Sequence, residues 1–190
     1  MRATTAIIAL LALAAPASAT GEIESLITQA DRERIAAFDK TFEEAVAEAR
    51  AGGATEDVAV LDAVVARPAL SFQDFDMTGD WQCRTIKAGG MAELVVYGWF
   101  KCRVSDDGSG WTLEKLTGSQ RTKGRFFTES DTRLTYLGGF HVAGDPVPAY
   151  GAGPDSDQVG YATRSGPDAF QIAFPAPRYE SKLDILELRR

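Results

Sequence analysis

The sequence predicts an α+β protein in which an N-terminal helical hairpin packs on an eight-strand antiparallel β-barrel or curved sheet. Two observations predict this fold. Apolar residues recur at helical spacing in residues 22–68 and at every second position in much of residues 77–190. Short strand-like runs separated by Gly, Pro, Asp and Ser are typical of antiparallel barrels and sandwiches.

The helical part contains two candidate helices. Thr28 is a candidate N-cap for the first, because Asp31 follows three positions later, and the glycine pair 52–53 ends it. Thr55 is a candidate N-cap for the second helix, and Pro68 stops it. Each helix has one apolar stripe that needs covering. The stripes contain Ile35, Phe38, Phe42, Ala45 and Ala49 in the first helix, and Val58, Leu61 and Val65 in the second.

The β part contains eight strand-like runs. The second run is apolar on both faces near its middle, so neither face is suited to water over its full length. We expect one face, with Leu94, Val96, Phe100 and Cys102, to line the β core. We expect the other face, with Val95, Tyr97 and Trp99, to lie under the helices. The runs cover residues 78–87, 93–104, 110–117, 121–128, 132–140, 157–165, 168–174 and 181–189.

Composition and charge limit the class of protein. The chain has 190 residues, 45% of them apolar, a formal net charge of −7 and a pI near 4.8. Residues 20–190 have the size of one globular domain. We expect no nucleic-acid partner, because phosphate backbones select basic faces. Residues 22–76 hold 13 acidic and 5 basic side chains, whereas residues 81–125 hold 4 acidic and 8 basic ones. Acidic helices that neutralise a basic sheet are the favoured interpretation, and an open anion-binding face is the alternative.

Residues 1–19 have the order of a secretory signal peptide. Arg2 gives a positive start, residues 6–15 are apolar, and small residues at 17–19 place the cleavage site after Ala19. The apolar run is about half the length of a membrane-spanning helix. We therefore expect a periplasmic or secreted protein that does not span a membrane.

Cys83 and Cys102 are the two cysteines of the chain. In an oxidising compartment an even pair usually forms a disulfide. A hairpin that turns within residues 88–93 would place the two cysteines directly opposite each other. A metal site would need more ligands than two cysteines and one histidine readily give. A catalytic thiol would need a base, for which His141 is the one histidine available.

Two polar segments are candidates for ligand binding. The turn within residues 113–125 combines Arg and Lys with Gly118 and Gly124, and such a turn suits a carboxylate, sulfate or phosphate group. A hydrated hairpin turn is the simpler alternative. Residues 141–157 form a long loop, and loops of this length are often lids or binding loops. The candidate ligand-binding or anion-binding residues are Arg84, Lys115, Arg121, Lys123, His141 and Tyr150.

Three functions follow from these features. The first is a non-enzymatic module that binds a small or anionic ligand or another envelope protein. The second is a hydrolase with His141 and either Asp155 or Asp157 at the barrel mouth. The third is a structural role in which the face with Tyr97 and Trp99 meets a partner. We expect no cofactor or metal, because the sequence has no Walker loop, Rossmann fingerprint, CxxC or HExxH motif.

Two resemblances add to this interpretation. Gly79, Asp80 and Trp81 at the start of the first strand resemble lipocalin and calycin barrels, which implies that Trp81 closes one barrel end and that Arg189 stacks over it. The phrases ITQADRERIAAFD, GDWQCRTIK, VVYGWFKCRV, LEKLTGSQRTKGRFF, DQVGY and ESKLDILEL resemble an exported bacterial family, domain of unknown function 4893. This second resemblance implies export and no particular activity.

Overall fold

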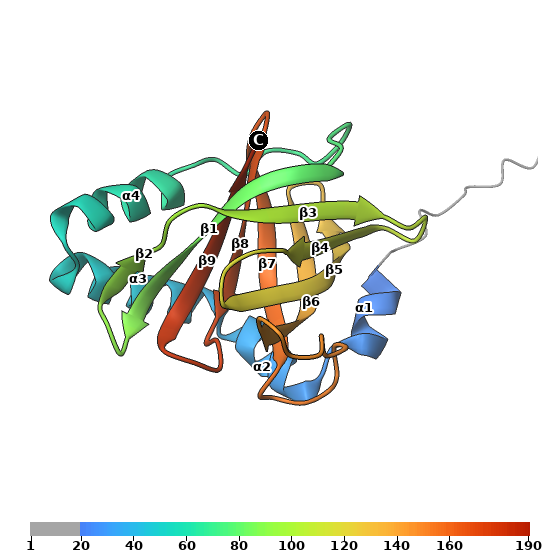
Figure 1. Ribbon diagram of the computed structural model, residues 1–190, viewed down its shortest axis with the longest axis horizontal. Helices are drawn as coiled ribbons and strands as arrows, with labels where there is room; N and C mark the ends of the chain where they lie inside the picture. The colour runs from blue at the N-terminus through green and yellow to red at the C-terminus, as the bar shows by residue number, and fades with distance from the viewer. Residues whose placement is uncertain (1–19) are drawn as a thin grey trace, which may run out of the picture.

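In the computed structural model, which describes residues 20–190, eight antiparallel strands close into a barrel, and four helices and a short extra strand lie around it (Figure 1). This confirms the predicted α+β class. The predicted leader, residues 1–19, lies outside the described residues. The helices are α1 (Thr20–Leu26), α2 (Gln29–Ala36), α3 (Phe38–Gly52) and α4 (Thr55–Val65). The strands are β1 (Gly79–Gly90), β2 (Leu94–Val96), β3 (Phe100–Asp106), β4 (Trp111–Lys115), β5 (Gln120–Ser130), β6 (Arg133–Val142), β7 (Asp157–Gly166), β8 (Ala169–Pro175) and β9 (Ser181–Arg189).

Strand β1 closes the barrel. It pairs with β9 along one edge, from Gln82 opposite Arg189 to Gly90 opposite Ser181. On its other edge, the first half of β1 pairs with β3 and the second half with β2. From β3 onward each strand pairs with the next one in the chain. Strand β2 is therefore a short extension beside the barrel.

The register slips by one residue between β2 and β3. Ile86 lies opposite Val96, whereas Cys83 lies opposite Phe100 and not opposite Trp99. The segment 97–99 thus holds one extra residue. In a strand, such an insertion exchanges the two faces. Because of it, the second predicted strand is split in two, and its predicted shared face is wrong.

Two apolar clusters result from this exchange. Leu94 on β2 and Ile86 on β1 face the helices, where they pack with Ala45 and Ala49 of α3. Cys102 on β3 faces the barrel interior with most of the large aromatic residues. Figure 1 shows α3 and α4 beside the end of the sheet that contains β2.

The predicted cover over Tyr97 and Trp99 is wrong. Tyr97 is 39% exposed. The ring of Trp99 lies beneath two guanidinium groups, 4.7 Å from that of Arg84 and 3.8 Å from that of Arg189. Cationic side chains, rather than helices, partly cover this part of the sheet.

The helix boundaries differ in part from the prediction. The side chain of Thr28 caps α2 by accepting a hydrogen bond from the backbone N–H of Asp31, as predicted. The first predicted helix is divided at Ala37 into α2 and α3. Thr55 is the first residue of α4, and its N-cap is Ala54, which has no side-chain oxygen. Every helix within residues 20–190 is too short or too polar to span a bilayer.

A disulfide joins Cys83 of β1 to Cys102 of β3, with a Cα–Cα distance of 5.9 Å. The predicted bond is confirmed, but the predicted direct opposition is wrong. Trp81 lies opposite Cys102, so the two cysteines are diagonal neighbours on the inward face. The disulfide and the described helices fit an exported protein.

Trp81 is buried near one end of the barrel, where its Nε1 donates a hydrogen bond to the carbonyl oxygen of Met77 at 2.8 Å. The guanidinium that stacks over its ring, at 4.4 Å, belongs to Arg190. The expectation for Arg189 is wrong, because alternation along β9 turns Leu188 inward and Arg189 outward, over Trp99.

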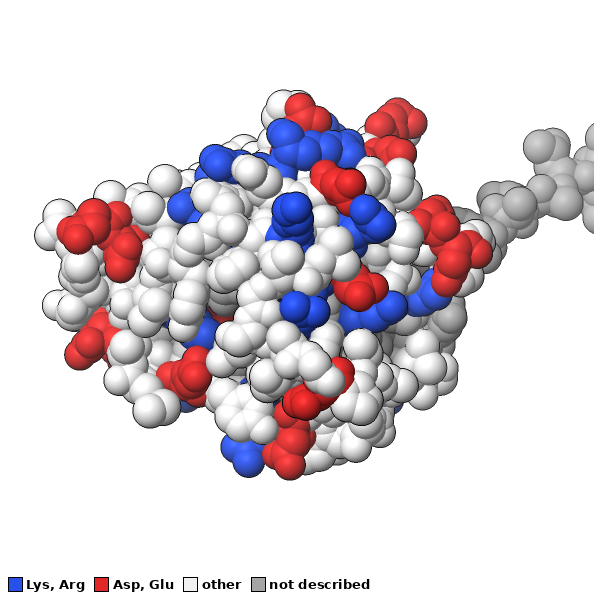
Figure 2. Space-filling model, in the orientation of Figure 1, with Lys and Arg blue, Asp and Glu red and all other residues white. Residues whose placement is uncertain are grey.

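The basic residues of the barrel are neutralised mainly by carboxylates of the β part. Acidic side chains gather over α3 and α4 at the left of Figure 2, whereas Lys and Arg gather with interspersed acids over the strands. Lys182 and Glu48 form one ion pair between a strand and a helix. The favoured interpretation of the charge division therefore fails for most of these residues. Ion pairs within the β part are Arg84–Glu187, Lys87–Asp184, Arg103–Asp80, Lys123–Glu114 and Arg125–Asp107.

The middle of the barrel is filled by Tyr136, which is fully buried and whose hydroxyl lies 2.7 Å from that of Thr122. Glycines make room for its ring. A Cβ atom on Gly124 would collide with the backbone of Leu137 and Gly138 and would lie 2.6 Å from the Tyr136 ring. Backbone atoms cannot yield as a flexible side chain can, so this position requires glycine.

We expect Gly124→Ala to lower the free energy of unfolding by about 2 kcal/mol or more, because an extra methyl group overfills a closed interior. Gly98→Ala is the matched control, since a Cβ atom there meets nothing within 4 Å. Urea unfolding followed by tryptophan fluorescence measures both variants. Equal stability of the two variants would contradict the tight packing around Tyr136.

Candidate ligand-binding pocket at the barrel mouth

The two ends of the barrel interior differ in chemistry. Along β1, alternate side chains point inward, and they change from Trp81 and Cys83 to Thr85 and Lys87. The apolar core fills the end that contains Trp81. At the other end a polar pocket begins beyond the disulfide.

This pocket has a cavity volume of about 50 Å³, enough for a few water molecules or one small anionic group. Its wall comes from seven strands, and its rim comes from the loops after β6 and β8. The wall residues are Thr85, Lys87, Lys115, Gln120, Arg121, Thr122, Phe140, Gln158, Phe174, Asp184 and Leu186. The rim residues are Asp155, Ser156, Pro177, Arg178 and Tyr179, and Asp157 lies where the loop meets β7.

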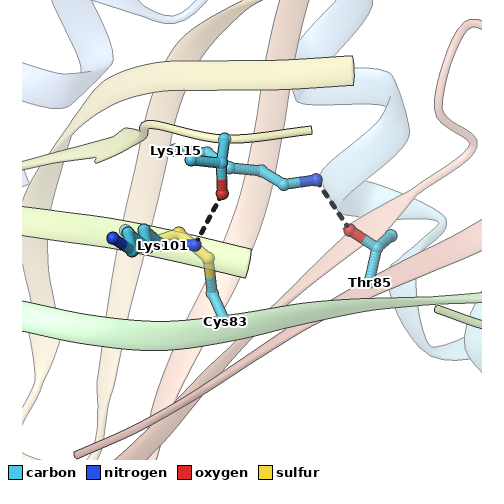
Figure 3. The surroundings of a disulfide bond; sticks show 6 residues. Cys83, Thr85, Lys101 and Lys115 are labelled. Atoms are coloured by element: carbon cyan, nitrogen blue, oxygen red, sulfur yellow. Dashed lines mark hydrogen bonds between the residues drawn. A yellow bond between two sulfur atoms is a disulfide. The ribbon is translucent and has the colours of Figure 1, made fainter. Parts of the chain in front are cut away.

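Lys115 is the central cation of the pocket. It lies opposite Cys102 in the β3–β4 ladder and is 6% exposed. Its Nζ donates a long hydrogen bond, 3.4 Å, to Oγ1 of Thr85 and lies 4.5 Å from the centre of the Phe100 ring (Figure 3 shows the bond to Thr85). In the described part of the chain, no carboxylate oxygen lies within ion-pair distance of it.

The surroundings of Lys115 disfavour its charged form. Burial lowers the pKa of Lys115 from 10.5 to about 8, and the charges of Lys87 and Arg121 act in the same direction. The charge of Asp184 acts in the opposite direction but does not outweigh them. A buried ammonium without a counter-ion is costly to a fold.

Lys87 provides a contrast within the same pocket. Its Nζ lies 3.1 Å from a carboxylate oxygen of Glu180 and 3.4 Å from one of Asp184. Burial alone would lower the pKa of Lys87, but these two carboxylates together raise it. Burial raises the pKa of Asp184, although the ammonium of Lys87 opposes this. Asp184 also accepts a hydrogen bond from the hydroxyl of Ser181.

The wall offers further polar groups. The Oε1 atom of Gln158 is buried and lacks a hydrogen-bond partner among the described residues. At the rim, Nε of Arg178 donates to Oδ1 of Asp155 at 2.7 Å and joins the two rim loops. A bound ligand therefore finds an ammonium and an unused amide oxygen below a bridged rim.

The structure brings together two of the six predicted binding residues, Lys115 and Arg121. Arg121 lines the pocket, and its Nε donates to the carbonyl oxygen of Gly118 at 3.0 Å. Arg84 lies outside the barrel, where it pairs with Glu187. Lys123 is exposed and pairs with Glu114 at 3.0 Å.

His141 and Tyr150 lie away from the pocket lining. His141 is buried, and its Nδ1 has no hydrogen-bond partner among residues 20–190. Its proposed partners are otherwise engaged: Asp155 with Arg178, and Asp157 with the backbone N–H of Gly151 at 2.9 Å.

Tyr150 holds the long loop against the helices. Its hydroxyl donates to the buried carboxylate of Asp31 and accepts from the backbone N–H of Thr28 at 3.1 Å. Burial, with the hydrogen bond to Asp31, raises the pKa of Tyr150 to about 12. This contact anchors the loop that forms part of the rim.

Sequence reasoning missed Lys87, Asp184 and Gln158. A signal for Lys87 was present, because it lies an even number of positions after Trp81 and Cys83 and so shares their inward face. No comparable signal distinguished Asp184 or Gln158. Among the described residues, His, Cys, Asp and Glu form no cluster of three or more that could hold a metal ion.

We expect Lys115→Met to be at least as stable as the natural protein at pH 7, because it removes a buried charge. The folded-state pKa of Lys115, about 8, lies below its ordinary value of 10.5, so the unfolded chain binds more protons between these two values. The stability of the natural protein should therefore rise relative to the variant between pH 8 and pH 10.5. Urea unfolding across this pH range measures the free energy of unfolding of both proteins. A difference that stays constant with pH would contradict the lowered pKa of Lys115.

Comparison with known proteins agrees with the predicted family. No curated protein and no solved structure matches the chain. One family model, described as "Domain of unknown function (DUF4893)", matches residues 24–188, which include nearly all of the described fold. The chain belongs to the DUF4893 family.

Proposed function

We propose that this protein is an exported, non-enzymatic module that binds a small carboxylate in the pocket at the barrel mouth. The observation that carries the proposal is the buried Nζ of Lys115, which has a hydroxyl and a ring as neighbours but, within residues 20–190, no carboxylate at ion-pair distance. Breaking a buried ion pair by removing one partner commonly costs several kcal/mol. A bound carboxylate would supply the missing partner.

The charges of the pocket favour a ligand with one negative charge. Lys87, Lys115 and Arg121 are the cations of the wall, and Asp184 and Glu180 are the carboxylates that face Lys87. At the rim, Arg178 and Asp155 cancel each other. One positive charge remains among these groups when Lys115 is protonated, and the carboxylate of Asp157, the further acid of the lining, accepts from the backbone N–H groups of Gly151 and Gly153.

The hydrolase alternative has less support. It requires His141 beside Asp155 or Asp157 at the mouth, and His141 is not among the lining residues. The partner-binding alternative rests on an open aromatic face, and the ring of Trp99 is instead stacked with Arg84 and Arg189.

We expect Lys115→Met to weaken the binding of lactate at pH 7 by about tenfold or more, because a charge-assisted hydrogen bond contributes roughly 1.5–3 kcal/mol. Binding to the natural protein should also weaken above pH 8, as Lys115 loses its proton. Isothermal titration calorimetry measures both effects, with inorganic phosphate as a second probe.

Lys123→Met is the matched control, because it removes an equal charge from the outer surface of the barrel. It should bind lactate as the natural protein does. Equal affinity of the Lys115 and Lys123 variants, or no binding of either probe by the natural protein, would contradict the proposal.

We expect the full chain, expressed in a bacterium with a periplasm, to accumulate there as a polypeptide that begins at Thr20. The order of residues 1–19 and the disulfide support this expectation. Intact mass before and after reduction reports both the cleavage and the bond. A cytoplasmic product that retains the leader would contradict the proposed export.

A further inference from the structure

We propose that Lys115 is a nucleophilic amine that forms a reversible imine with a small oxo acid, a carboxylate whose neighbouring carbon is an aldehyde or ketone. This inference rests on the proposed carboxylate pocket and names the ligand class. Its basis is the position of Lys115, which is buried in a cavity and, among residues 20–190, has no carboxylate oxygen within ion-pair distance.

Lys115 differs from the other lysines that the structure describes. Lys87, although equally buried, is held by two carboxylates. Lys123 pairs with Glu114, and Lys182 pairs with Glu48. Lys40 and Lys101 are exposed. Lys115 thus combines burial with the absence of an acidic partner.

The groups around Lys115 leave part of it unprotonated near neutral pH. Lys87 and Arg121 repel its charge, and the carboxylates of Asp184 and Glu180 are shared with Lys87. The Phe100 ring favours the cation but does not restore an ordinary pKa. At pH 7 roughly a tenth of Lys115 is the free amine, against less than a thousandth of an ordinary lysine. Desolvation beside a second cation is a known way to activate a lysine.

The proposed step is an addition followed by loss of water. The lone pair of Nζ attacks the carbonyl carbon of the ligand, and a proton passes from Nζ to the carbonyl oxygen to give a neutral carbinolamine. This intermediate loses hydroxide and a proton, together one water molecule, and leaves a C=N bond. No electrons are gained or lost, and hydrolysis reverses the step.

The remaining pocket groups suit the rest of such a ligand. Arg121 is among the lining residues and its charge acts on Lys115, and in the proposal this positive charge attracts the carboxylate of the ligand. The hydroxyl of Thr85, 3.4 Å from Nζ, is a hydrogen-bonding group for the hydroxyl of a carbinolamine formed on Nζ. The small cavity limits the ligand to a few heavy atoms.

Glyoxylate with cyanoborohydride tests the proposal, because the reductant converts an imine into a stable carboxymethyl amine. We expect Lys115 in the natural protein at pH 7 to be labelled roughly tenfold faster than Lys101, the exposed internal reference. Peptide mapping by mass spectrometry gives both rates. Labelling of Lys115 at or below the rate of Lys101 would overturn the inference.

The variant Lys87→Met tests the cause of the reactivity. It removes the neighbouring ammonium and leaves Asp184 to face Lys115, so labelling of Lys115 at pH 7 should slow severalfold and recover at higher pH. In the control variant Lys123→Met, Lys115 should be labelled at the same rate as in the natural protein. An unchanged pH profile in Lys87→Met would count against the inference.

Lactate separates this inference from the proposed function, because lactate has the carboxylate but no carbonyl group to attack. If lactate binding depends on Lys115 while glyoxylate labels Lys115 no faster than Lys101, the carboxylate pocket stands and the imine is refuted. If Lys115 is labelled selectively while lactate does not bind, the imine stands and the general carboxylate site is refuted.

Discussion

The structure depends on the pairing of β1 with three other strands. Its pairing with β9 closes the barrel, its first half holds β3, and its second half holds β2 and, with it, the surface on which α3 packs. One strand therefore serves the barrel interior on one face and the helical layer on the other. The alternation of β1 places Trp81 and Lys87 inside and Ile86 outside, and this alternation determines both the core and the pocket.

The depth of the pocket follows from the packing of the barrel centre. Tyr136 occupies the interior because Gly124 on β5 and Gly138, two positions further along β6, have no side chains to exclude it. The ring of Tyr136 belongs to the apolar core, whereas its hydroxyl forms a hydrogen bond with Thr122. The interior therefore changes from apolar to polar at this residue. A barrel of eight strands has an interior only wide enough for side chains or one small ligand. With the centre filled, the space for a ligand inside the barrel lies at the end that contains Lys115.

Local patterns predicted the fold better than the site. Alternation, the Thr28 cap and the cysteine pair were each readable from neighbouring residues. The one-residue slip at 97–99 was not readable, because the run is apolar on both faces and either register suits it. The site was predicted from basic residues, and the prediction did not establish which of their side chains faced inward. Parity with Trp81 and Cys83 was enough to place Arg84 on the outer face, but Lys123 was equivalent to Lys115 in the sequence, and tertiary pairing shows that it lies outside with a carboxylate partner.

The position of Lys115 explains why its charge stays without a partner. Its neighbour Glu114 points outward, where it pairs with Lys123, and alternation along β4 prevents it from turning toward Lys115. Asp184 is shared between Lys87 and Ser181. The disulfide at Cys102 fixes the position of the strand opposite Lys115. An apolar residue there would cost the fold less. Within residues 20–190 no carboxylate pairs with this ammonium, and the proposed ligand would supply its counter-ion through the mouth.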